Sequence, residues 1–347
     1  MLPPTYVPGF HDEEAVRAMR YNDLGTTGLE VSHLGLGGGP LGIYGDYPEE
    51  DAIATVREAI RQGINYIDTA PFYGLGRSEE VLGKALKGVP RQAYYIATKV
   101  GRYTMDPRTM FDFSAQKTRE SFAKSLELLQ LDYVDIIQVH DVEFVQNPDV
   151  IIRETLPVLQ EFVAVGKARF IGITGYPLEP LREIVEKSGS VKVDTVLSYT
   201  RDTLVDDTLQ RHLPFFKEKG VGVICAAGTA MGLLSSTGPQ PWHPAPQKLR
   251  DACRAAADYC KERGVELARL AMHHALTREG QATHVVGINS TQILRSNLQI
   301  LRDGLTSTEQ EVLRDVQKKF FAQLPVRHWE GLELTMLREE WRKMGML

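Results

Sequence analysis

The chain has 347 residues, of which 43% are hydrophobic and 24% charged, and its formal net charge is −5 at pH 7. This balance argues against nucleic acid or an anionic membrane surface as a partner. We see no apolar run of the roughly 18 residues that span a bilayer and no secretory signal. The three cysteines exclude a disulfide scaffold. We therefore expect a cytoplasmic α/β enzyme that acts on small molecules.

The predicted elements begin with an extension over residues 1–19, which we expect to be loose, and a hairpin over 21–31 around a Gly-Thr-Thr-Gly turn. The hairpin could close the bottom of a barrel. Short β-branched runs then predict eight strands, at residues 33–37, 64–68, 93–99, 134–140, 168–174, 193–198, 221–226 and 284–287.

Amphipathic segments alternate with these strands and predict helices. They cover residues 49–62, 79–86, 114–130, 148–165, 178–187, 206–219, 247–263 and 291–302. Such alternation indicates a parallel sheet, and eight units favour closure into a (β/α)8 TIM barrel over an open doubly wound sheet. Residues 305–347 are predicted to form an extra helix and a tail, with Trp329 and Trp341 available to pack on a surface.

Four titratable side chains follow three consecutive predicted strands. Asp68 and Tyr73 stand at the end of the second strand and just beyond it, Lys99 ends the third, and His140 ends the fourth. The active site of such a barrel lies at the carboxyl ends of its strands. A neighbouring ammonium lowers the pKa of a tyrosine, and a histidine can polarise a carbonyl oxygen. The cluster therefore predicts a tyrosine acid/base suited to carbonyl reduction or alcohol oxidation.

The motifs DTAPFYG, ATKVG and VHD around these residues resemble the catalytic tetrad of the aldo-keto reductases. The resemblance runs from about residue 20 to 302 and implies one barrel domain. It also implies the roles: Tyr73 is the acid/base, Lys99 lowers its pKa, Asp68 holds Lys99, and His140 orients the reacting oxygen. Within the family, the segments 111–114, 173–175, 196–199 and 230–234 resemble aldose dehydrogenases for L-galactose-like sugars. That likeness implies oxidation at the anomeric carbon to a lactone.

The resemblance further implies a nicotinamide cofactor across the barrel mouth. The residues that it assigns to this cofactor are Gly37, Gly38, Thr174, Ser198, Gly287, Asn289, Ser290 and Asn297. The first two glycines let the backbone approach the cofactor, and the N-terminal amides of the last barrel helix face its phosphates. The segment 287–291 has no lysine for a 2′-phosphate, which favours NAD, while Arg295 leaves NADP possible.

Tyr44, Tyr103 and Asp141 are candidates for the substrate wall, and we expect no metal site. His243, in a proline-rich loop after the seventh strand, is interpreted first as a loop anchor and second as a substrate contact. Residues 37–42 match G-x-G-x-x-G, but Pro40 and the loop before residue 49 argue against a Rossmann fingerprint.

Two other functions stay open at this point. One is an NADPH-dependent aldehyde or ketone reductase, which differs from the aldose dehydrogenase in its preferred cofactor and direction. The other is a regulatory subunit that resembles aldo-keto reductases, as in potassium-channel β subunits, although the intact tetrad argues against this as the sole role.

Overall fold

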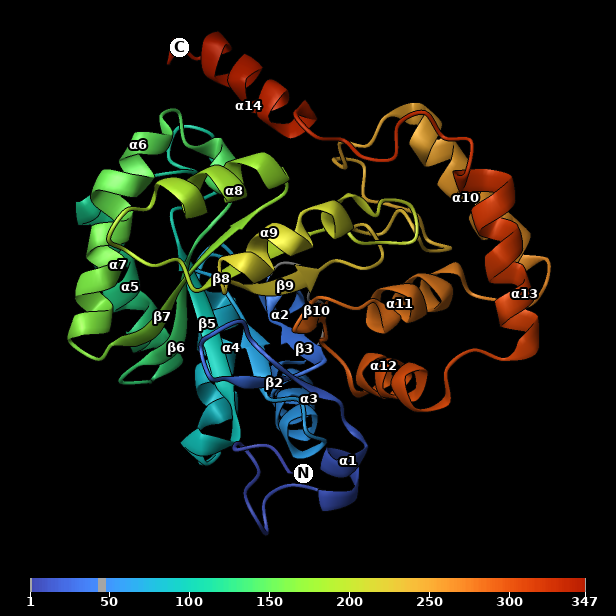
Figure 1. The fold of residues 1–347 in the computed structure, drawn as a ribbon, viewed down its shortest axis with the longest axis horizontal. Coiled ribbons are helices and arrows are strands. Elements are labelled where there is room, and N and C mark those ends of the chain that lie inside the picture. Colours follow the sequence, from blue (N-terminus) through green and yellow to red (C-terminus); the bar gives the residue numbers. More distant parts are fainter. Residues whose placement is uncertain (1, 43–47, 347) are drawn as a thin grey trace.

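Eight parallel strands close into a barrel in the computed structural model, which describes residues 2–42 and 48–346 (Figure 1). The order around the barrel is β10-β3-β4-β5-β6-β7-β8-β9, so neighbours in sequence are neighbours in space. These strands are β3 (Leu34–Gly37), β4 (Tyr66–Asp68), β5 (Tyr95–Val100), β6 (Val134–Val139), β7 (Ala168–Gly175), β8 (Thr195–Tyr199), β9 (Gly222–Ala226) and β10 (Thr283–Gly287). The predicted TIM barrel and its eight strands are confirmed.

Helices surround the barrel, and each of the predicted segments contains one. The helices are α2 (Gly39–Gly42), α3 (Glu49–Arg61), α4 (Arg77–Leu86), α5 (Ala115–Leu129), α6 (Pro148–Val150), α7 (Leu156–Ala164), α8 (Leu178–Lys187), α9 (Leu213–Glu218), α10 (Gln247–Lys261), α11 (Leu267–Thr277) and α12 (Thr291–Asp303). Helix α11 was not predicted. Its Leu270, Ala271 and Ala275 are fully buried, and it is apolar on several faces, so it lacks the one-sided pattern of a surface helix.

The barrel interior is filled by side chains that alternate with outward-facing ones along each strand. Tyr66, Ala97, Ile136, Leu197 and Ile224 belong to this inner cluster, together with Leu24, Leu29 and Val31 of the N-terminal hairpin. The hairpin strands are β1 (Tyr21–Asp23) and β2 (Glu30–Ser32), which pair antiparallel. The hairpin therefore closes the amino end of the barrel, as predicted.

Residues 2–19 of the N-terminal extension are ordered, so the expectation of a loose extension was wrong for them. Helix α1 (Glu13–Ala18) begins at Asp12, whose side chain accepts a hydrogen bond from the Ala15 amide. Val16 and Met19 are buried against the body of the protein. Asn65 also donates a hydrogen bond to Thr5 over 2.9 Å. One buried side chain on a six-residue helix and one just after it are too few to show a period in the sequence.

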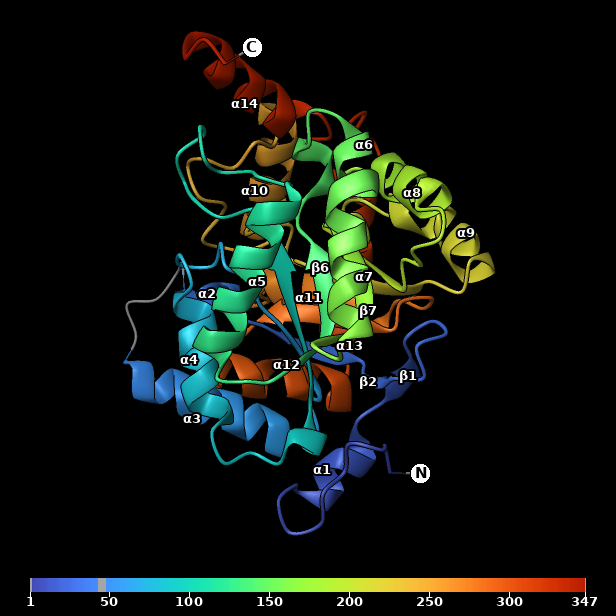
Figure 2. The same ribbon diagram turned by 90° about the vertical axis from the view of Figure 1, so that its left-hand side faces the viewer.

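Two helices, rather than the single one predicted, follow the barrel. Helix α13 (Ser307–Val316) starts with a capping box of Thr306 and Glu309, and α14 (Leu332–Lys343) ends the chain. Figures 1 and 2 show α14 at the opposite end of the molecule from α1. Trp329 and Trp341 are buried, which confirms that they pack on a surface. In the described part of the chain, we find no helix with the length and apolar character needed to cross a membrane.

Candidate active site

The carboxyl ends of β4, β5 and β6 bring the four predicted catalytic side chains together. Asp68 is the last residue of β4, Lys99 lies near the end of β5, and His140 directly follows β6. Tyr73 comes from the loop between β4 and α4, and its ring lies edge-on to the His140 imidazole with centroids 5.8 Å apart. Side-chain alternation explains why all three strands direct these groups inward.

Lys99 lies at the centre of the hydrogen bonds in this cluster. Its buried ammonium contacts Asp68 and donates hydrogen bonds to the Thr69 carbonyl, 2.8 Å away, and to the Tyr73 hydroxyl, 3.3 Å away. The other Asp68 oxygen accepts a hydrogen bond from Gln138 over 2.8 Å. Both carboxylate oxygens are thus occupied, which fixes the ammonium beside the phenol.

The environment sets the protonation states of these groups. Burial lowers the pKa of Lys99, but the charges of Asp68 and Tyr73 outweigh it and hold that pKa above its ordinary value. Burial raises the pKa of Tyr73, and Lys99 lowers it by less, so the net direction is upward. The expectation that Lys99 lowers this pKa names the correct interaction but omits the larger effect of burial. Burial also lowers the pKa of His140 to about 3, which keeps its imidazole neutral.

A close approach between two loops holds Tyr73 in place. A Cβ atom added to Gly42 would lie 2.2 Å from the Tyr73 carbonyl oxygen, and one on Gly74 would lie 2.6 Å from backbone atoms of Gly42. Gly74 also has a φ of +65°. Ser78 donates a hydrogen bond to the Gly38 carbonyl over 2.8 Å, which ties the start of α4 to the same region.

Arg102 is a residue of the mouth that the sequence did not single out. Its guanidinium lies 3.9 Å from the centre of the Phe72 ring and donates a hydrogen bond to Asp141 over 2.6 Å. Asp141, a predicted substrate residue, has left-handed backbone geometry with a φ of +50° and adjoins His140. Its amide donates a hydrogen bond to Thr174 over 3.0 Å. The structure thus joins Asp141 and Thr174, which the sequence assigned to different ligands.

Tyr103 and Tyr44 have different outcomes. The Tyr103 hydroxyl accepts a hydrogen bond from the Gly101 amide over 2.8 Å, and the Lys117 ammonium of α5 lies 5.1 Å from its ring centre. Its neighbour Arg102, rather than Tyr103, contacts Asp141. Tyr44 lies outside the described residues. His243 is buried, contacts the Ala230 carbonyl and packs against Trp329, which fits the loop-anchor interpretation.

The residues assigned to a cofactor lie around the end of β3, at β7 and β8, and at the start of α12. Gly37 pairs with Gly287 of β10 on one side and with Asp68 of β4 on the other. Ser290 caps α12, and Asn289 precedes it half-buried. A Cβ atom on Gly38 would lie 2.6 Å from the Ser78 hydroxyl.

Two observations test how well these residues fit a nucleotide. Asn297 is buried on α12, and its side-chain oxygen has no hydrogen-bond partner within residues 2–42 and 48–346, so it can accept one from a ligand. Ser198 lies between Leu197 and Tyr199, which face the barrel interior, so its side chain points to the outer face. Its hydroxyl is therefore not directed into the mouth. The α12 end fits the nucleotide, whereas the position of Ser198 does not support its assignment.

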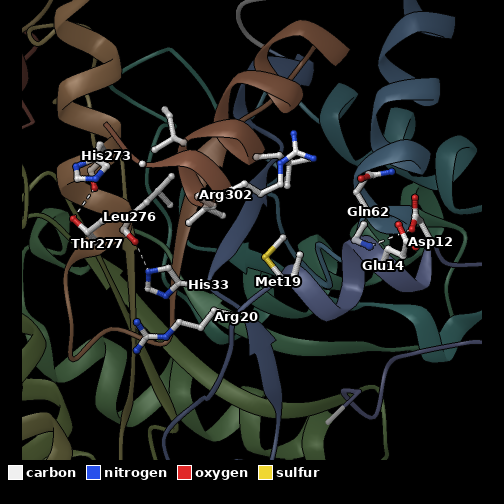
Figure 3. A pocket seen from close by; sticks show the side chains of 16 residues that line it. Asp12, Glu14, Met19, Arg20, His33, Gln62, His273, Leu276, Thr277 and Arg302 are labelled. Atoms are coloured by element: carbon white, nitrogen blue, oxygen red, sulfur yellow. Dashed lines mark hydrogen bonds between the residues drawn. The ribbon is translucent and has the colours of Figure 1, made fainter. Parts of the chain in front are cut away.

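A cleft of about 630 Å³ lies at the other end of the molecule. Figure 3 shows Met19, Arg20 and His33 on one side of it and His273 and Arg302 on another. These residues belong to the start of β3 and to the segments around α1, α11 and α12. The cleft and the tetrad therefore lie at opposite ends of the barrel.

Comparisons with known proteins agree with this geometry. A model of the aldo/keto reductase family matches residues 33–318. L-galactose dehydrogenase of Arabidopsis thaliana is 45% identical over 298 residues, which cover 85% of this chain and 92% of that protein. D-arabinose 1-dehydrogenase of Saccharomyces cerevisiae is 33% identical, with coverages of 87% and 94%. An aldo-keto reductase of Bacillus halodurans, solved in its holo form, superposes with a TM-score of 0.69 at 29% identity and covers 86% of this chain and 96% of its own.

Proposed function

The chain belongs to the aldo/keto reductase family, and we propose that it is an NAD-dependent aldose dehydrogenase that oxidises an L-galactose-like sugar at its anomeric carbon. The observation that carries this proposal is the contact of Lys99 with both Asp68 and Tyr73 beside a neutral His140. Two relatives that cover most of the chain are aldose dehydrogenases by name. The product of such an oxidation is a lactone.

The chain's own residues would perform the proton chemistry. Tyr73, as the phenolate, takes the proton from the C1 hydroxyl of the sugar while the C1–H bond breaks and the C1–O double bond forms. The Lys99 ammonium stabilises that phenolate, and Asp68 keeps the ammonium charged. The neutral His140 can donate one hydrogen bond to the reacting oxygen. A nicotinamide, when bound, supplies the hydride acceptor.

The cofactor is assigned to the end of the barrel that carries the tetrad. Gly37, Gly287, Asn289, Ser290 and Asn297 are the residues that we assign to its binding. The unpartnered oxygen of Asn297 supports an adenine contact, and the N-terminal amides of α12 support a phosphate contact. The segment 287–291 has no lysine to bind a 2′-phosphate, so we propose NAD rather than NADP. Arg295, which is exposed on α12, is the cation that would hold such a phosphate if NADP were bound.

A panel of neutral aldoses, each tested with NAD and with NADP, examines this proposal. Reduced-nicotinamide absorbance should rise with an L-galactose-like sugar and NAD, and it should rise far more slowly with NADP. No rise with any aldose, together with rapid NADPH-dependent reduction of an aldehyde, would contradict the proposal in favour of a carbonyl reductase. If the protein binds cofactor but turns over neither class, a regulatory role replaces the enzymatic one.

A further inference from the structure

The C-terminal segment 329–341, which we name the C-terminal strap, crosses the barrel mouth and is anchored on both sides of β6. At one end, Trp329 stacks on Tyr176 with ring centroids 4.9 Å apart, and its amide donates a hydrogen bond to the Tyr176 hydroxyl. At the other end, the Trp341 indole donates a hydrogen bond to the Pro107 carbonyl over 2.8 Å. Tyr176 directly follows β7, and Pro107 lies in the loop after β5.

This anchoring places the strap over the end of β6. Strand β6 lies between β5 and β7 in the barrel, and His140 and Asp141 follow its last residue. An ion pair from Glu330 to the buried Arg201, just beyond β8, adds a further attachment. Arg201 is itself paired with Asp206 at 2.9 Å. The strap is therefore attached at three points, beyond β5, β7 and β8, around the strand end that carries His140.

Glu333, in the first turn of α14, is the acidic side chain that the strap brings to this place. It is half-buried, and it interacts electrostatically with Asp141 and Arg102 and lies against the Trp329 side chain. Its charge also acts on Tyr199 and on Glu143. These residues come from β8 and from the segment after β6, so Glu333 faces the same space as Asp141.

Three carboxyl groups, those of Asp141, Glu143 and Glu333, surround this space, and burial raises the pKa of Glu143 well above its ordinary value. Arg102 is already paired with Asp141 at 2.6 Å. Glu143 accepts a hydrogen bond from the Tyr176 amide. A carboxylate can accept hydrogen bonds from sugar hydroxyls, but it repels a second carboxylate where solvent screening is weak.

We propose that Glu333 is a specificity residue that admits neutral aldoses and rejects their 6-carboxylate counterparts, the uronates. This inference rests on the proposed function, since it concerns the far end of the sugar that is oxidised at C1. Glu333 accepts hydrogen bonds from hydroxyls distant from C1 and takes no part in the proton transfer. Its removal should therefore change KM more than kcat.

The test compares kcat/KM for a neutral aldose and for the matching uronate. The wild-type protein should prefer the neutral sugar by about 100-fold, and Glu333→Gln should narrow that ratio about 10-fold. For the neutral sugar, Glu333→Gln should raise KM several-fold with kcat nearly unchanged. Glu339→Gln, on an exposed position of the same helix, is the matched control and should change neither value. Thermal melting confirms that both variants fold.

The pH dependence gives a readout that a merely structural role would not produce. Burial and the charge of Asp141 raise the pKa of Glu333 to about 7, although Arg102 and the Trp329 side chain lower it. Discrimination against the uronate should thus grow between pH 6 and pH 8 in the wild type and should stay constant in Glu333→Gln. If the ratio of kcat/KM for the neutral aldose to that for the uronate is equal in the wild type and in Glu333→Gln at every pH, the inference is overturned.

Failure of the proposed function can be told apart from failure of this inference. If the wild type oxidises no aldose but reduces aldehydes, the proposed function fails. The same comparison is then made with a neutral aldehyde and a carboxylate-bearing aldehyde in the direction of reduction. If the ratio of kcat/KM for the neutral aldehyde to that for the carboxylate-bearing aldehyde narrows in Glu333→Gln, the charge of Glu333 still sets specificity. If this ratio is unchanged, the inference is rejected.

Discussion

The Lys99 ammonium donates a hydrogen bond to the Tyr73 hydroxyl over 3.3 Å. Its nitrogen also lies 4.8 Å from the centre of the Tyr73 ring. The contact joins the end of β5 to the loop after β4, and it offsets part of the burial that raises the pKa of Tyr73. Lys99 therefore eases the loss of the Tyr73 proton, although burial opposes that loss more strongly.

Replacing Lys99 by methionine should shift the pH profile of sugar oxidation to the alkaline side. A positive charge favours the phenolate, so its loss raises the pKa of Tyr73 and delays formation of the base. We expect a shift of at least about one pH unit in kcat/KM. Lys84→Met, on the exposed side of α4, is the control and should leave the profile unchanged. A profile that does not move in Lys99→Met would show that Lys99 does not tune Tyr73.

Tyr73→Phe should remove the proton acceptor and leave cofactor binding intact. General acid–base catalysis is worth about 10² to 10⁴ in rate, so kcat should fall by about 10³-fold. Quenching of intrinsic fluorescence by the reduced cofactor should give the same dissociation constant in both proteins. Turnover at the wild-type rate would mean that another group is the acid/base.

Gly74→Ala should damage activity because of where the added methyl group goes. The new Cβ would lie 2.6 Å from the Gly42 backbone, so the Tyr73 loop has to move. A misplacement of about 1 Å can cost about 100-fold in rate. Gly88→Ala is the matched control, since Gly88 also has a positive φ but no atom of the described residues lies within 4 Å of its added Cβ. Equal activities in the two variants would contradict the role of the close approach.

Acid should destabilise the fold through buried neutral histidines. Burial, together with the neighbouring His33 and His274, lowers the pKa of His284 to about 3. An unfolded histidine has a pKa near 6.5, so the unfolded state binds a proton first as the pH falls. The free energy of unfolding should drop by about 2 kcal/mol for this group between pH 6.5 and pH 5.

Urea unfolding of His284→Leu at both pH values measures this effect. Between pH 6.5 and pH 5, the free energy of unfolding should fall by about 2 kcal/mol less in the variant than in the wild type. His328→Leu, at a half-exposed position, serves as the control. If His284→Leu and the wild type lose equal free energy of unfolding on acidification, His284 does not cause the acid sensitivity.

The alternating strands and helices of the barrel were predictable because their apolar residues recur at regular intervals along the sequence. The strand that ends at Asp68 and the one that contains Lys99 each show a β-branched run followed by a polar residue, and barrel topology places such residues together. Helix α8 was predicted with its observed bounds, Leu178–Lys187, because its apolar residues lie on one face.

The residues of the mouth beyond the tetrad were less predictable because their partners are distant in sequence. Arg102 contacts Asp141, 39 positions away, and Trp341 contacts Pro107, 234 positions away. Neither contact leaves a local pattern. Ser198 was assigned to the cofactor from the family resemblance, but the register of β8 between Leu197 and Tyr199 decides its direction.

Transfer of deuterium from a sugar labelled at C1 tests the central claim most directly. The wild-type protein is given an L-galactose-like aldose carrying deuterium at C1, with NAD, and the products are analysed by NMR. The account predicts that the deuterium appears at C4 of the reduced nicotinamide and that the sugar becomes a lactone. A lactone-free mixture, or deuterium that stays on the sugar, would contradict oxidation at the anomeric carbon.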